Sequence, residues 1–300
     1  MRGERDRIRT GLLFISPWLF GFLVLTLYPV IASAYYSFTE FRVLSPPKWV
    51  GLRNYAELFS DRDYFLPSLA NTVFMFIELP IAVALAVGIA LLLNQKLRGM
   101  AVFRTIFYLP SVVPTVASAI LWLWLLNPEY GLVNRGLGVM GIPGPGWLQD
   151  PVWSKPGFIV MNLWMVGGNI IIYLAALQGV PTHLYEAAEL DGASAWRRTW
   201  HVTLPAISPV IFFNLVLGVI NTFQYFTQPF MMTGGPGIPP GGPANSTLLY
   251  PLYLFQNAFS FFRMGYASAM AWILFLLTVL ATLLVFKTSA RWVYYEGESH

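Results

Sequence analysis

Four polar side chains in the second half of the sequence recur at the spacing of one helix face. Asn221, Gln224, Tyr225 and Gln228 follow the pattern i, i+3, i+4, i+7, which brings residues to the same side of a helix. An amide offers both donors and acceptors of hydrogen bonds, and a hydroxyl-rich solute such as a sugar needs both. The same residue types also join membrane helices to one another, and the spacing alone does not favour either interpretation.

A second polar set, Asn162, Trp164 and Asn169, precedes the first and offers the same combination of amides and an aromatic ring. Glu78 is an ionisable residue inside another apolar segment, two positions before Pro80. A carboxyl group there is costly, so we expect it to pair with a neighbouring helix or to lie beside a water-filled path. Because no Lys or His accompanies it within the segment, it would make a poor proton relay.

The charged segment 186–209 lies between two long apolar stretches. Residues 182–190 favour a helix, which we expect to end at Asp191-Gly192 because glycine allows the positive φ of a bend. Ser194 can cap a second short helix. The small pair Ala187-Ala188 leaves one face low enough for another protein to approach closely. Charge and periodicity alone, however, favour an ordinary amphipathic loop between two spans.

Several kinds of chemistry lack their motifs. The sequence contains no cysteine, no Gly-x-x-x-x-Gly-Lys-Ser/Thr, no His-Glu-x-x-His and no Gly-x-Ser-x-Gly. Cys-based zinc sites, thiol nucleophiles and ATP binding through a P-loop are therefore excluded. We expect no metal site, no cofactor and no enzymatic activity in this chain.

The composition indicates a membrane protein. The chain is 56% hydrophobic and 11% charged, whereas a soluble domain carries about 25% charged residues. A spanning helix needs about 20 apolar residues, and backbone groups in hydrocarbon must pair within the helix. The sequence therefore predicts an all-α membrane protein with one domain over residues 1–300 and six spans, at about 11–38, 69–94, 105–126, 157–178, 206–232 and 264–286.

The positively charged residues predict how the spans are oriented. With an inside N-terminus, eleven Lys and Arg residues fall inside and seven outside, and the cytoplasmic side normally carries the excess. Segment 247–262 is apolar but short, and we expect it to be a helix at the outer face. If it were a seventh span, the C-terminus would lie outside the cell. The inside set is Arg2, Arg5, Arg7, Arg9, Lys96, Arg98, Arg104, Arg197, Arg198, Lys287 and Arg291, and the outside set is Arg42, Lys48, Arg53, Arg62, Arg135, Lys155 and Arg263.

The charged segment also resembles the cytoplasmic coupling loop of bacterial ABC-importer permeases. That family pattern runs Glu-Ala-Ala, three residues, Gly, nine residues, an aliphatic residue, one residue and Leu-Pro. Here Glu186-Ala187-Ala188 leads to Gly192 and then to Val202-Thr203-Leu204-Pro205. The full spacing favours a coupling loop over an ordinary one. The resemblance implies that the contact with an ATPase subunit is made by Tyr185, Glu186, Ala187, Ala188, Asp191, Gly192, Leu204 and Pro205.

Further short motifs are similar to those of sugar-transporting permeases of the maltose and glycerol-3-phosphate type, and Glu78 is a departure from them. These motifs are Asn71-Thr72, Phe103-Arg104-Thr105, Tyr108-Leu109-Pro110, Trp122–Trp124, Asn162–Trp164, Gly234-Gly235-Pro236 and Tyr250–Phe259. The resemblance implies the type I importer permease fold. It implies partners as well: a second permease, two ATPase subunits that bind ATP and magnesium, and an external solute-binding protein.

The same resemblance implies a sugar path along the fourth and fifth spans and a cell membrane of a bacterium or archaeon, with both termini cytoplasmic. Asn162, Asn169, Asn221 and Gln224 are its best candidates, together with Trp164, Tyr225 and Gln228. No basic residue falls within the predicted spans, so a neutral saccharide is favoured over glycerol-3-phosphate, which needs a counter-charge. The alternative is an ion-coupled secondary transporter or channel, which would explain the spans and Glu78 but not the coupling-loop spacing.

Overall fold

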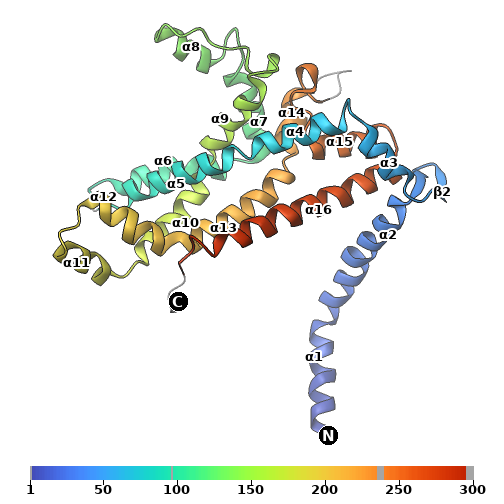
Figure 1. Cartoon of the computed structure of the whole chain (residues 1–300), viewed down its shortest axis with the longest axis horizontal. Coiled ribbons are helices and arrows are strands. Elements are labelled where there is room, and N and C mark those ends of the chain that lie inside the picture. Colours follow the sequence, from blue (N-terminus) through green and yellow to red (C-terminus); the bar gives the residue numbers. More distant parts are fainter. Residues whose placement is uncertain (1, 96, 235–239, 295–300) are drawn as a thin grey trace. The chain divides into compact units, whose positions relative to one another are not determined.

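The computed structural model of the chain describes residues 2–95, 97–234 and 240–294, most of which are helical (Figure 1). The chain forms two compact units, Met1–Arg62 with Leu254–Phe275 and Asp63–Tyr253 with Leu276–His300. The long helix α16, Met264–Ser289, passes from the first unit into the second. Lys96, which was counted on the inside, lies outside the described residues. So does the Gly235-Pro236 pair, which is part of one of the family motifs.

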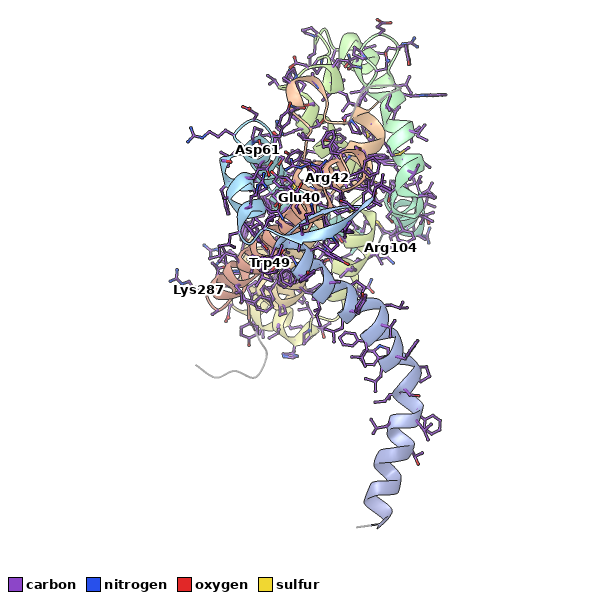
Figure 2. The ribbon with its side chains drawn as sticks, turned by 90° about the vertical axis from the view of Figure 1, so that its right-hand side faces the viewer. Glu40, Arg42, Trp49, Asp61, Arg104 and Lys287 are labelled. Carbon is purple, nitrogen blue, oxygen red and sulfur yellow. The ribbon has the colours of Figure 1, made fainter. Side chains whose placement is uncertain are left out.

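The first unit begins with a continuous apolar rod. It consists of α1 (Arg2–Gly21), a π-helical segment (Phe22–Leu27) and α2 (Tyr28–Ser37). The stretch Thr10–Ser37 is long and apolar enough to cross a membrane, and none of its most apolar part is buried within the chain. Figure 2 shows its side chains projecting on all sides. Lipid or another protein must therefore cover this rod.

A β-hairpin follows the rod, and the sequence analysis did not predict it. Strands β1 (Thr39–Arg42) and β2 (Ser45–Trp49) pair antiparallel, with Glu40 opposite Lys48 (Figure 2). The second strand contains Pro46-Pro47, and proline is tolerated on an edge strand, where its missing N–H breaks no ladder bond. Helix α3 (Arg53–Ser60) holds the hairpin, because Asn54 Nδ2 donates to the Thr39 carbonyl in β1 at 2.9 Å.

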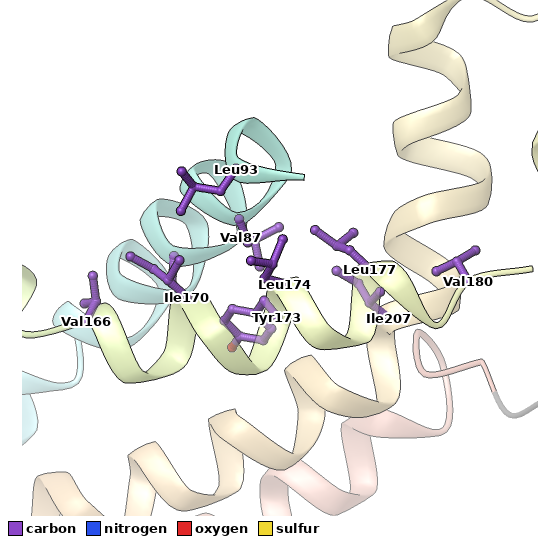
Figure 3. Close-up of a cluster of buried hydrophobic side chains, with 11 residues drawn as sticks. Val87, Leu93, Val166, Ile170, Tyr173, Leu174, Leu177, Val180 and Ile207 are labelled. Carbon is purple, nitrogen blue, oxygen red and sulfur yellow. The ribbon is translucent and has the colours of Figure 1, made fainter. Parts of the chain in front are cut away.

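The second unit is a helical assembly whose core lies between α5, α10 and α13. Figure 3 shows part of this core, in which Val87, Ile170, Tyr173 and Ile207 are buried together. A second buried cluster, which includes Met75, Trp122 and Phe158, lies among α4, α7, α9 and α14. The α-helices of this unit are α4 (Phe65–Met75), α5 (Glu78–Leu93), α6 (Met100–Val112), α7 (Thr115–Leu125), α8 (Leu132–Val139), α9 (Ser154–Trp164), α10 (Gly167–Gln178), α11 (Thr182–Leu190), α12 (Ala195–Arg198), α13 (Leu204–Phe223) and α14 (Thr227–Thr233), and α15 (Tyr250–Phe255) lies at its boundary with the first unit.

Three of the spans expected to be straight are bent or broken. Helices α6 and α7 meet at an angle of 100°, and α9 and α10 at 47°. Val113 leaves the helical conformation just before Pro114, since the residue before a proline disfavours helical dihedrals. The expected span 206–232 ends as a continuous helix at Phe223, and α14 begins separately at Thr227.

The number of apolar helices agrees with a multi-pass membrane protein. Among the described residues, four helices are long and apolar enough to cross a membrane, and the number rises to six if each bent pair forms one span. The segment expected at the outer face contains α15 and a π-helical turn, Gln256–Ser260. At about 1.5 Å per residue, this segment is too short to cross a hydrocarbon core of about 30 Å.

Gly167 marks the closest approach of α10 to α6. A Cβ atom there would lie 2.3 Å from the Phe107 carbonyl oxygen, whereas a Cβ at the neighbouring Gly168 would meet nothing within 4 Å. We expect Gly167→Ala to destabilise the protein by about 1–3 kcal/mol, because the backbones must separate. The thermal midpoint of unfolding in detergent should fall for this variant and stay unchanged for Gly168→Ala. Equal midpoints for the two variants would contradict the close packing.

Candidate functional site

The segment 182–209 folds into a bent pair of short helices, as its sequence predicts. Helix α11 ends in a Schellman motif, in which the Ala193 N–H donates to the Ala188 carbonyl at 2.9 Å and the Gly192 N–H to Glu189 at 3.0 Å. This motif places its C′ residue in the left-handed region, and Gly192 has φ +74°. Ser194 then caps α12, since its hydroxyl accepts the Arg197 N–H at 3.4 Å.

Two side-chain contacts fix α11 against the second half of the bent pair. The Tyr185 hydroxyl lies 3.1 Å from the Thr203 hydroxyl, within the π-helical turn Thr199–Thr203. Glu189 forms an ion pair with Arg198. Tyr185 and Glu189 are one helical turn apart, so one face of α11 is joined to the following segment. These two contacts connect α11 to the segment that follows it.

The rest of α11 presents an exposed tip. Glu186, Ala187, Asp191 and Gly192 are exposed, and Leu190 is 90% exposed at the end of the helix. An exposed leucine beside a turn with small side chains is typical of a surface that another protein covers. The structure thus places four of the eight expected coupling residues, Glu186, Ala187, Asp191 and Gly192, together at one exposed tip.

Tyr185 and Ala188 are half-buried on α11, whereas Leu204 and Pro205 form the first turn of α13. Leu204 and Tyr185 pack against the core formed by α5, α10 and α13. These residues connect the exposed tip to the long helices.

A polar contact links α5, α9 and the turn between α13 and α14. Asn162 Nδ2 donates to the Glu78 carboxylate at 2.9 Å, and the Tyr225 hydroxyl donates to Asn162 Oδ1 at 3.2 Å. The intramembrane carboxyl therefore has a partner on a neighbouring helix, one of the two environments expected from the sequence. An amide can make four hydrogen bonds, so Asn162 retains some capacity for a solute.

The other path candidates fall into separate groups. The break after Phe223 means that Asn221, Gln224, Tyr225 and Gln228 do not share one continuous helix face, which corrects the expectation from their spacing. Asn221, Gln224 and Asn169 are exposed, whereas Gln228 is half-buried on α14. The Trp164 ring meets the edge of Trp122 at 5.9 Å. Pro229 was the local signal that could have revealed the break, because a proline cannot bond to the carbonyl four residues before it, here that of Tyr225.

The sequence analysis missed a polar clamp on the loop before α15. Asn71 Nδ2 donates to the Asn245 carbonyl at 2.8 Å, and the Tyr250 N–H donates to the Thr72 hydroxyl at 2.8 Å. Lys155 Nζ donates to Asn71 Oδ1 at 3.1 Å. The Asn71-Thr72 pair was visible as a motif, but its partners Asn245 and Tyr250 are more than 170 residues away in the sequence.

Comparison with known proteins gives consistent matches. Residues 64–293 match the family model described as binding-protein-dependent transport system inner membrane component. The chain is 41% identical to the probable ABC transporter permease protein YesP of Bacillus subtilis, over 99% of this chain and 96% of that protein. It is 36% identical to the lactose transport system permease protein LacF of Rhizobium radiobacter, over 92% of each.

The fold is also known from a solved structure. A subunit of a bacterial ABC transporter involved in the import of the acidic polysaccharide alginate superposes with a TM-score of 0.82 at 25% identity, covering 97% of this chain and 99% of the other. The fold class expected from the sequence, a helical importer permease of type I, is confirmed. The resemblance to sugar-type ABC permeases is confirmed as well.

Proposed function

This chain belongs to the family of binding-protein-dependent transport system inner membrane components, and from this we propose that it is the permease subunit of an ATP-driven importer of a saccharide. It is a multi-pass membrane protein of a transport family rather than of an enzyme family. The relatives that import lactose and alginate support a carbohydrate substrate. The subunit would pass substrate from an external solute-binding protein into the cytoplasm.

The observation that carries this proposal is the rigid, bent helix pair with its exposed tip. Its anchors are spaced as in the coupling loops of importer permeases, and its apolar end at Leu190 is uncovered in this chain. We infer that the tip sits in a cleft on an ATPase subunit, which would bind ATP and magnesium. A second permease and a second ATPase would complete the importer.

The proposed transport mechanism requires that the same helices pack in two ways, one inward-facing and one outward-facing. Closure of the ATPase pair on ATP moves the tip, and the contacts through Tyr185 and Leu204 carry that motion into α13 and the core. ATP thereby shifts the balance between inward-facing and outward-facing arrangements. The requirement is that the bent pair keeps its shape while it moves, and the two contacts across it supply that rigidity.

The orientation and the substrate path are part of the same proposal. Both termini and the exposed tip would lie in the cytoplasm of a bacterial or archaeal cell, as the excess of inside Lys and Arg favours. The saccharide would pass along Asn162, Asn169, Asn221 and Gln224, with Trp164, Tyr225 and Gln228 beside it. A neutral saccharide is favoured over glycerol-3-phosphate or a related polyol phosphate, because the predicted spans carry no basic residue to pair with a phosphate.

The proposal is tested by purification of the chain through an affinity tag from its native membrane. We expect a second permease and ATPase subunits to co-purify in fixed ratio, and the complex to accumulate saccharide in proteoliposomes only with ATP. A chain that purifies alone and transports on an ion gradient would contradict the proposal and favour a secondary transporter.

The substrate path predicts a specific effect of Asn221→Ala. The Asn221 side chain is exposed and, within the described part of the chain, makes no hydrogen bond. Its loss should leave assembly intact and weaken the apparent affinity for saccharide by about tenfold, the value of one or two hydrogen bonds. Asn214→Ala is the control, because Asn214 bonds within its own helix to the Val210 carbonyl. Unchanged uptake kinetics for Asn221→Ala would show that the saccharide path does not include Asn221.

A further inference from the structure

An apolar groove of about 400 Å³ lies in the second unit, outside the coupling tip and the polar path. Its walls are α5 on one side and α13 on the other, and the segment from α12 into the π-helical turn lines one end. Pro80, Gly88 and Leu91 belong to the α5 wall, whereas Trp196 and Trp200 line that end, which is the mouth of the groove. We name it the tryptophan groove.

The length of the tryptophan groove matches one leaflet of a bilayer. The α5 wall runs from Pro80 to Leu91 and the α13 wall from Leu204 to Leu215. Eleven residue steps at 1.5 Å give about 16 Å on each wall, and half of the hydrocarbon core is about 15 Å. A spanning helix of a partner would need a groove of about twice this length. The dimensions therefore fit an acyl chain that enters from one membrane surface.

The tryptophan end has the character of a lipid headgroup region. Trp196 is 71% exposed and Trp200 is 53% exposed, and their rings meet edge to face at 5.7 Å. Tryptophan is enriched where hydrocarbon meets headgroups. Arg197 lies between them in sequence, is exposed and has no ion-pair partner in the described part of the chain, whereas Arg198 pairs with Glu189. An unpaired cation that is adjacent to Trp196 in the sequence favours an anionic headgroup at this end of the groove.

We propose that the tryptophan groove binds one acyl chain of an anionic phospholipid, with its phosphate beside Arg197. The inference rests on the proposed function only in assigning the lipid to the cytoplasmic leaflet. The bound chain contacts α5, α13 and the second half of the coupling segment together. Lipid composition thereby sets how firmly that segment is held against the long helices.

The groove offers a substitution that fills it without disturbing the fold. A Cβ atom at Gly88 would meet nothing within 4 Å, and leucine is a better helix former than glycine. Gly88→Leu therefore occupies the space of the acyl chain. Gly21→Leu is the matched control, since Gly21 lies in a helix of the first unit and also has open space around its Cβ. For the headgroup, Arg197→Gln is compared with the exposed Arg291→Gln.

The experiment uses the chain with its co-purifying subunits in bilayers of phosphatidylglycerol or phosphatidylcholine that carry a photoreactive diazirine in one acyl chain. In the unmodified protein we expect labelling of peptides 80–91 and 196–215. Gly88→Leu should lower this labelling about tenfold, the value of two buried methylenes. Arg197→Gln should remove a preference for phosphatidylglycerol of about fivefold. Both controls should label as the unmodified protein does.

Equal labelling of the unmodified protein and Gly88→Leu would overturn the proposal, and so would equal losses in the two controls. The chain has no cysteine, so Gly88→Cys provides a single reactive thiol. A cross-link from that thiol to another subunit, without lipid labelling of the groove, would assign the groove to a protein helix. Labelling requires no transport, so intact labelling with no saccharide uptake would count against the proposed function alone.

Discussion

Gly192→Asp should reduce ATP-driven saccharide uptake by about a hundredfold, because an unpaired charge buried at a protein contact costs about 3 kcal/mol. The substitution causes no clash within this chain, since a Cβ at Gly192 would meet nothing within 4 Å. Asp also tolerates the left-handed conformation better than most residues. The loss would therefore arise at the surface that covers the exposed tip of α11.

The measurement is uptake and ATP hydrolysis by the complete complex in proteoliposomes. Gly141→Asp is a matched control, because Gly141 has φ +73° and the same open surroundings but lies in a different segment. Gly192→Asn separates charge from size. Normal uptake by Gly192→Asp, or an equal loss in Gly141→Asp, would contradict a role of the tip in coupling.

The local structure of the coupling segment could be predicted from the sequence because its signals are local. The predicted helix 182–190 is α11, and Asp191-Gly192 ends it through backbone bonds within the same turn. The cap by Ser194 also depends on neighbouring residues only. The contacts that make the pair rigid could not be predicted, because Tyr185 and Thr203 are brought together only when the second helix folds back.

The spans show the same division between local and tertiary causes. Their positions follow from apolar composition, which a window of about 20 residues detects. The bend between α6 and α7 also has a local cause in Pro114. The close packing of α10 on α6 at Gly167 is a tertiary feature that the sequence alone does not show. The β-hairpin was missed for a related reason, since an edge strand with Pro46-Pro47 is stabilised by its partner rather than by its own sequence.

Glu78 illustrates how far the sequence can define a site. Its cost inside a span indicated a partner or a water path, but several helices could have supplied the partner. The structure assigns that role to Asn162, a residue that the sequence analysis placed on the substrate path for a different reason. One amide thus serves an internal network and remains a candidate for contact with the saccharide.

Asn162→Ala should lower uptake by about tenfold to a hundredfold, because it removes the hydrogen-bond donor to a half-buried carboxylate. It also removes the acceptor for the Tyr225 hydroxyl. The thermal midpoint in detergent should fall together with uptake. Asn169→Ala is the matched control, since the Asn169 side chain is exposed and makes no hydrogen bond with the described residues. It should keep its thermal midpoint even if its loss weakens saccharide binding.

Glu78→Gln and Glu78→Ala then decide what the carboxyl group contributes. A glutamine can still accept the Asn162 N–H, so Glu78→Gln should retain uptake if Glu78 acts as an acceptor that positions Asn162. Glu78→Ala should resemble Asn162→Ala, because either change breaks the same contact. The double variant should be little worse than either single one, since coupled residues are not additive. A full loss in Glu78→Gln would show instead that transport depends on the charge itself, and additive losses in the double variant would separate Glu78 from Asn162.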